Sequence, residues 1–184
     1  MKPKKPLIYV LITYVFCLNS YLYAQTDTLN GPQQNADSTK VIVPKQVQAD
    51  IKMITPPEGF VVSDRFNGYI HYQAGAAIIM SMLENTNFIN IEKGMTDDFF
   101  RLNQLVLIEK RNFESNNGNK GLIYKSTFVL NGKDFVRYFV YAGDLNRTLW
   151  LAITYPKAAE ILVDSEILKS IQSINLKPSS DDHK

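Results

Sequence analysis

Residues 120–155 read KGLIYKSTFVLNGKDFVRYFVYAGDLNRTLWLAITY, and this stretch decides the fold. It contains three runs of β-branched and aromatic residues, which are typical of strands. Asn131 and Gly132 separate the first two runs, and residues 143–146 (GDLN) separate the second run from the third. Short breaks rich in Gly, Asn and Asp between such runs indicate tight hairpins. The stretch therefore predicts three consecutive antiparallel strands.

Both faces of this predicted sheet are largely apolar. Successive side chains of a strand point to opposite faces of the sheet. On the middle strand, one face carries Phe135, Arg137, Phe139 and Tyr141, and the other carries Val136, Tyr138 and Val140. A sheet that is apolar on both sides has to be covered on both sides. The predicted fold is therefore α+β, an antiparallel sheet with helices on both faces.

Further strands are predicted before this meander. Residues 60–63, 69–72 and 105–111 are short apolar runs bounded by turn residues, which favours strands. Residues 76–83 (AAIIMSML) are continuously apolar, so a buried strand and a helix both fit. The short length of this run and the turn residues after it favour the strand.

Two helices are predicted. Residues 95–103 form the first, because Thr96 or Asp97 can cap its exposed amides. Its expected apolar stripe comprises Phe99, Leu102 and Val106. The second follows Pro156 and is expected to bury Leu162, Val163, Ile167, Ile171 and Ile174 on the sheet. Residues 164–166 (DSE) offer an alternative, in which this segment breaks into two helices.

The chain begins with the pattern of a secretory signal peptide. Residues 1–6 (MKPKKP) are basic, residues 7–18 (LIYVLITYVFCL) are apolar, and Ala24 precedes a polar stretch. The alternative is a membrane anchor, but the apolar run has 12 residues, whereas crossing a bilayer takes about 20. We therefore expect a signal peptide at residues 1–24 and an exported protein, periplasmic or extracellular, with no stable membrane insertion.

Removal of the signal peptide changes the charge of the chain. The full sequence has 20 basic and 18 acidic residues and a pI of about 8.5. Lys2, Lys4 and Lys5 leave with the signal peptide, so 17 basic residues remain against 18 acidic ones, a net charge of −1. This balance does not support a nucleic-acid partner. The single cysteine, Cys17, also leaves, so the mature chain has no disulfide and no cysteine metal site.

The mature chain is expected to hold one folded domain, residues 51–176. Residues 25–50 are rich in Thr, Asn, Gln, Asp and Ser, which predicts a flexible linker. Within it, residues 40–43 resemble a short edge strand that Pro44 limits. The polar residues 177–184 predict a disordered tail.

The order of these features resembles the PsbP-like family. The residues that carry the resemblance are residues 57–60 (PEGF), a hairpin, an apolar strand, a Thr-Asp helix, and residues 149–156 (LWLAITYP) leading into a closing helix that ends at residues 170–174 (SIQSI). The resemblance covers roughly residues 53–176. It implies an αβα sandwich like that of an extrinsic photosystem II subunit and of the Ran-binding Mog-type nuclear import factor. It also implies a binding or accessory role, and no family site residue is matched here.

The sequence carries no catalytic pattern, so we expect neither an enzyme nor a cofactor. A phosphate-binding glycine motif and a nucleophile elbow are both absent from it. His71 lies in a predicted strand whose neighbours Tyr69 and Tyr72 can satisfy it, which favours a structural role over metal ligation. Asp97 and Asp98 are adjacent helix residues that do not face each other, so capping is favoured over acid–base catalysis.

Arg137 is the main candidate binding residue. It lies among Phe135, Phe139 and Tyr141 on one predicted sheet face, where a buried cation without a partner is costly. It is expected either to pair with a carboxylate, to extend to the sheet edge, or to line a pocket that receives an anion.

Two functional hypotheses follow. The first is an exported protein without enzymatic activity that binds another protein of the bacterial cell envelope. The alternative is a carrier of a small apolar or anionic ligand between sheet and helix, with Arg137, Tyr141 and His71 as candidate binding residues. A hydrolase that depends on His71 is a distant third.

Overall fold

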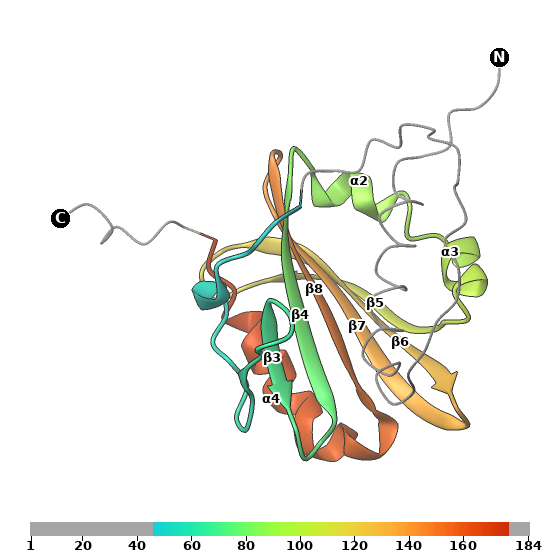
Figure 1. Ribbon diagram of the computed structural model, residues 1–184. Helices are drawn as coiled ribbons and strands as arrows, with labels where there is room; N and C mark the ends of the chain where they lie inside the picture. The colour runs from blue at the N-terminus through green and yellow to red at the C-terminus, as the bar shows by residue number, and fades with distance from the viewer. Residues whose placement is uncertain (1–45, 177–184) are drawn as a thin grey trace, which may run out of the picture. The chain divides into compact units, whose positions relative to one another are not determined.

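The computed structural model describes residues 46–176, which build one antiparallel sheet and a few helices (Figure 1). Seven strands follow one another in the order β2-β3-β4-β8-β7-β6-β5, and β1 pairs with β4 outside this path. The strands are β1 (Gln46–Val47), β2 (Val61–Val62), β3 (Gly68–His71), β4 (Ala76–Glu84), β5 (Val106–Glu114), β6 (Lys120–Leu130), β7 (Lys133–Gly143) and β8 (Arg147–Pro156). The fold is therefore of the α+β class.

Several predictions lie outside the described residues. These are the signal peptide at residues 1–24, the edge strand at residues 40–43, the tail at residues 177–184 and most of the linker at residues 25–50. The end of the expected linker is described. There β1 pairs with β4, and the short 3-10 helix η1 (Ile51–Met53) follows, capped by the Asp50 carboxylate.

The predicted meander is confirmed as β6, β7 and β8. Asn131 and Gly132 both have positive φ values, 52° and 72°, as a two-residue hairpin of type I′ requires. At the next turn, the Asp144 carboxylate accepts hydrogen bonds from the backbone N–H groups of Asn146 and Arg147 at 2.7 and 2.9 Å. Both hairpins thus follow from local turn chemistry that the sequence displays.

The strand predicted at residues 76–83 is β4, and it pairs with the last strand, β8. The opposite edge of β4 pairs with β3 over Ala76 to Ile79 and with β1 at Met82 and Leu83. Gly68 makes the β3 contact possible, because a Cβ atom at this position would lie 1.8 Å from the Ile78 carbonyl oxygen.

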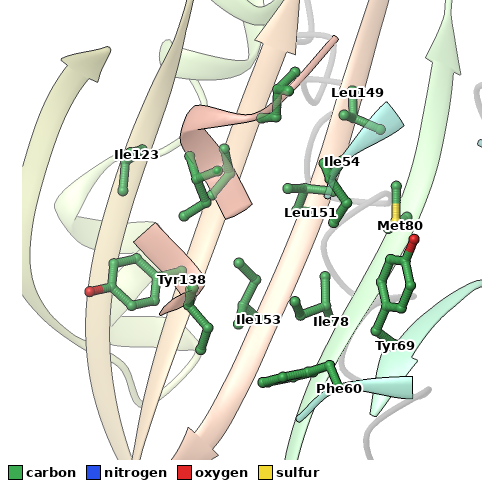
Figure 2. Packing of buried hydrophobic residues seen from close by; sticks show 14 of the residues in the cluster. Ile54, Phe60, Tyr69, Ile78, Met80, Ile123, Tyr138, Leu149, Leu151 and Ile153 are labelled. Carbon is green, nitrogen blue, oxygen red and sulfur yellow. The ribbon is translucent and has the colours of Figure 1, made fainter. Parts of the chain in front are cut away.

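The helix α4 (Glu160–Gln172) packs on one side of the sheet, here called the first face. It follows the 3-10 turn η2 (Lys157–Ala159) and remains unbroken through residues 164–166, so the two-helix alternative is wrong. Figure 2 shows Ile54 and Phe60, which precede β2, in the same core as side chains of the strands. The core contribution of the helix is Val163, Ile167 and Ile171, followed by Ile174. Leu162, which we expected to be buried, is 61% exposed.

Two short helices, α2 (Phe88–Glu92) and α3 (Asp97–Leu102), lie at one end of the sheet (Figure 1). The prediction of α3 is confirmed, with the Thr96 hydroxyl accepting from the Phe99 N–H at 3.3 Å, whereas α2 was not predicted. The expected stripe is partly wrong, because Phe99 and Phe100 are buried while Leu102 and Val106 are exposed.

Arg137, Phe139 and Tyr141 lie on the second face, opposite the α4 side. The rings of Phe99 and Phe100 contact Phe139 and Tyr124 there, with centroids 6.2 and 5.8 Å apart. A helical layer across both faces is therefore not established, since only α4 runs along the sheet.

Candidate functional site

The structure brings two of the three predicted binding residues to the same face of the sheet. Arg137 and Tyr141 are both on β7 with side chains on the second face, four residues apart. His71 is at the end of β3, which β4 and β8 separate from β7. His71 pairs with Ala76 of the first-face core, so it lies on the opposite side of the sheet. The three residues do not form one site.

Arg137 is buried, with 2% of its surface exposed, which disfavours the alternative that it extends to the sheet edge and reaches solvent. Its Nε donates to the Thr154 hydroxyl at 3.0 Å, and Thr154 lies directly opposite it on β8. Its guanidinium carbon lies 4.6 Å from the centroid of the Phe128 ring, a cation–π arrangement. Phe128 in turn stacks on Phe135, which holds the ring in place.

Burial lowers the pKa of Arg137 to about 10, because the apolar surroundings disfavour the charged form. The side chain nevertheless stays protonated at neutral pH. Arg137 can therefore orient an anion or a carbonyl oxygen as a hydrogen-bond donor, but it cannot exchange a proton near pH 7.

Tyr141 belongs to an aromatic cluster on the second face, defined by Phe99, Phe100, Tyr124, Phe139 and Tyr141. Its hydroxyl donates to the Met95 sulfur at 3.7 Å, and burial raises its pKa above the ordinary tyrosine range. Burial also raises the pKa of Tyr124 to about 12, with a smaller contribution from Glu92. Neither phenol ionises near neutral pH.

His71 is engaged in local structure. Its Nδ1 accepts a hydrogen bond from the Ala74 N–H at 3.2 Å, and its ring meets Phe60 edge-on at 5.3 Å. The imidazole also lies against Gly59, where a Cβ atom would be 2.5 Å from Nε2. These contacts favour the structural role expected for His71.

A polar cluster between α4 and the first face was not recognised in the sequence. The Asp164 carboxylate accepts from the Tyr138 hydroxyl at 2.7 Å and from the Tyr155 hydroxyl. The Lys125 ammonium lies 3.2 Å from Asp164 and 2.8 Å from Glu160. We call these five residues the Asp164 cluster. Its members come from β6, β7, β8 and α4, so only the folded chain brings them together.

The pKa shifts in the Asp164 cluster hold each group in its ordinary charge state. Burial alone would raise the pKa of Asp164, but hydrogen bonds from Tyr155, Tyr138 and Lys125 outweigh it and lower the pKa. Burial likewise opposes the charge on Lys125, yet its contacts with Glu160 and Asp164 raise its pKa overall. Burial raises the pKa of Tyr138 to about 12. A general acid or base works best with a pKa near the operating pH, so this arrangement suits helix anchoring better than proton transfer.

An open groove of about 1010 Å³ lies beside β4, away from the predicted binding residues. It is lined by the segment around Asp50 and by the β2–β3 turn, including Asp64, Arg65 and Asn67. The Asn67 side-chain amide donates to the carbonyl groups of Ala49 and Met80 at 3.0 and 3.1 Å. These two hydrogen bonds link the walls of the groove.

Residues 46–176 offer neither a metal-ligand cluster nor a membrane-spanning helix. No group of three or more metal-ligating side chains comes together in that part of the chain. Nor does any of its helices have the length and hydropathy of a membrane span, and α4, the longest, has 13 residues.

The comparisons with known proteins give structural likenesses only. No family model and no curated protein matches the sequence. A Pseudomonas aeruginosa protein of unknown function, PA94, is 11% identical, with 82% of this chain and 92% of that chain covered and a TM-score of 0.48. LpqN of Mycobacterium tuberculosis, described as involved in cell envelope biogenesis, is 10% identical over 70% of this chain and 82% of its own, with a TM-score of 0.49.

A third structure, from Bacteroides thetaiotaomicron, is 12% identical, covers 70% of this chain and 47% of its own, and has a TM-score of 0.42. The PsbP-like resemblance is not confirmed by these comparisons. They assign no function to the chain.

Proposed function

We propose that this chain is an exported binding protein of the cell envelope, which acts through contact with another protein and has no catalytic activity of its own. The observation that carries the proposal is the recurrence of exposed apolar residues along the short stretch in which α3 leads into β5. Leu102, Val106 and Ile108 are 60%, 61% and 59% exposed. Single exposed apolar residues are common, but several within one short stretch of chain suit an interaction surface.

The position of this group suits a protein partner. β5 is the last strand of the sheet, so its outer edge offers backbone hydrogen-bonding groups beside the exposed side chains. Glu109, Lys110 and Arg111 follow directly and place charges next to the apolar residues. An apolar centre with a polar border is the usual composition of a protein interface.

The pKa directions also support binding over catalysis. The pKa values of Asp164, Lys125 and Tyr141 are all shifted further from neutral pH. Arg137 stays charged at neutral pH. We further propose that the PsbP-like αβα architecture applies here, with the second face as the less completely covered side.

The interface is tested by site-specific photo-crosslinking in the native cells. A photoreactive amino acid at Val106 is expected to give an adduct with one polypeptide, and Ile108→Glu is expected to abolish it. The same amino acid at Ser165, on the exposed side of α4, serves as the matched control. Equal adduct patterns from the two positions, or no adduct from Val106, would contradict the proposal.

Export is tested separately by the mass of the protein recovered from the cells. Cleavage of the signal peptide predicts a mature chain that begins at Gln25. A chain that keeps residues 1–24 and sediments with the membranes would favour the membrane anchor instead.

The second candidate function, a ligand carrier, is favoured by the buried guanidinium of Arg137 between Phe128 and Thr154. Native mass spectrometry of protein purified from its own envelope would then show a stoichiometric added mass. Arg137→Ala is expected to lose that mass, whereas the matched variant Arg147→Ala, at the exposed start of β8, keeps it. A wild-type protein without added mass would remove this candidate.

A further inference from the structure

The hydroxyl of Tyr124 has no evident structural role. Tyr124 is fully buried, and within residues 46–176 its hydroxyl meets no hydrogen-bonding partner. Burying a hydroxyl without a partner is unfavourable, and phenylalanine would fill the same space without that cost. Beside it, the Tyr141 hydroxyl is engaged by the Met95 sulfur at 3.7 Å and by the Trp150 side chain. The Tyr124 hydroxyl therefore points to a partner that enters from outside.

The segment that covers these hydroxyls, residues 87–104, is attached to the sheet mainly through four buried side chains, those of Ile91, Met95, Phe99 and Phe100. It contains α2 and α3, and within the described residues the loop and cap hydrogen bonds of its backbone join residues of the segment to one another or to Leu105. Its polar links to the sheet are the bond between Tyr141 and Met95 and one ion pair, in which Lys110 of β5 lies 2.9 Å from Glu92 of α2. Segments held mainly by a few buried side chains open at low free energy.

The ends of this segment are fixed and one of them is strained. Thr86 is held to the β7–β8 turn, because its N–H donates to the Asn146 carbonyl at 3.1 Å and its carbonyl accepts from the Thr148 hydroxyl at 2.6 Å. Leu105, at the other end, is buried. Between them, Gln104 has a φ of 55°, a left-handed conformation that is unfavourable for a residue with a side chain. A rotation at Gln104 would relieve this strain and move α3.

We propose that residues 87–104 form a lid over a binding site on the second face, whose ligand is a flat apolar molecule with a hydroxyl or carbonyl oxygen. When the lid opens, the rings of Phe99 and Phe100 leave Phe139 and Tyr124, and the ring of the ligand takes their place. The Tyr124 hydroxyl can both donate and accept, so it suits either kind of oxygen. This site goes beyond the proposed protein interface and does not depend on it.

The ligand class is tested with two probes that differ by one hydroxyl, 1-naphthol and naphthalene. The purified mature protein is expected to bind 1-naphthol about fivefold more tightly, the effect of one additional hydrogen bond. Tyr124→Phe is expected to bind both probes equally. Tyr138 is a buried tyrosine of the opposite face, so Tyr138→Phe is expected to keep the preference for 1-naphthol. Equal affinities in the wild type, a preference that survives in Tyr124→Phe, or no binding of either probe would overturn the proposal.

The lid is tested by removing the ion pair between α2 and β5. Glu92→Gln is expected to raise the affinity for 1-naphthol up to about fivefold, because the open state becomes more populated. Asp98→Asn is the matched control, since its partner Arg101 lies on the same helix and the pair does not reach the sheet. An equal response of the two variants would show that the segment does not act as a lid.

Discussion

Two buried tyrosines on neighbouring strands have opposite hydrogen-bonding environments. The Tyr124 hydroxyl has no partner in the described part of the chain, whereas the Tyr138 hydroxyl donates to Asp164 at 2.7 Å. Tyr124→Phe should therefore raise the free energy of unfolding by about 1 kcal/mol, and Tyr138→Phe should lower it by about 1–3 kcal/mol. Urea denaturation of the three proteins measures both changes. A loss of stability in Tyr124→Phe would mean that its hydroxyl is satisfied in solution.

Single residues were predicted well where their environment is local. The alternation on the middle strand placed Arg137 and Tyr141 together on one face, as the structure has them. Asp164 was interpreted only as a possible helix break, because a short polar side chain disfavours helix interiors. Its hydrogen bond to Tyr138 spans 26 residues of sequence, and a contact of that kind leaves no periodic signal.

At the scale of elements, α4 shows how far an apolar pattern can specify a buried stripe. Leu162 and Val163 are adjacent apolar residues, but only Val163 faces the sheet. Leu162→Gln should change the free energy of unfolding by less than about 0.5 kcal/mol. Ile167→Ala should lower it by about 2–5 kcal/mol, because Ile167 is completely buried. Thermal denaturation of both variants distinguishes them, and equal losses would contradict this helix orientation.

The attachment of α4 to the sheet should depend on pH through Asp164. Its pKa in the folded protein lies below the unfolded value of about 3.9. The carboxylate therefore stabilises the fold above about pH 4, and this contribution is lost as the pH falls through the folded pKa. Asp164→Asn should lower the free energy of unfolding at pH 7 by about 2–3 kcal/mol.

Denaturation of the wild type and of Asp164→Asn between pH 7 and acidic pH measures this dependence. The free energy of unfolding should fall less steeply with decreasing pH in the variant than in the wild type. Glu166→Gln is the control on the same helix, because its ion pair with the exposed Lys169 contributes little. If the two variants lose equal stability at pH 7, the cluster does not anchor the helix.

At the scale of the whole molecule, the sequence indicated the fold class but not the order of the strands. Hairpins such as β6–β7 join neighbours along the chain, so Asn131 and Gly132 were enough to predict them. The pairing of β4 with β8 joins residues 76–84 to residues 147–156, and no local turn encodes it. The helix α2 was missed because five residues are too few for a helical period to appear.

The sheet joins two cores, so the described domain should unfold as one unit. Ile167 lies in the first-face core and Phe99 contacts the second face, with the strands between them. Ile167→Val and Phe99→Leu should each lower the free energy of unfolding by about 1 kcal/mol. Because the two sites share no contact, the double variant should show the sum within about 0.5 kcal/mol.

Urea transitions followed by far-UV circular dichroism and by fluorescence of the single tryptophan, Trp150, test this expectation. Trp150 lies opposite Tyr141 on the second face, so its emission reports on the side that α2 and α3 contact. Coincident midpoints would show that β7 and β8 couple the two cores, as two-state unfolding requires. A fluorescence transition at lower urea concentration, shifted by Phe99→Leu and unaffected by Ile167→Val, would instead show that the second face unfolds separately. In that case the lid would be a folding unit of its own, and opening it would not require the first-face core to move.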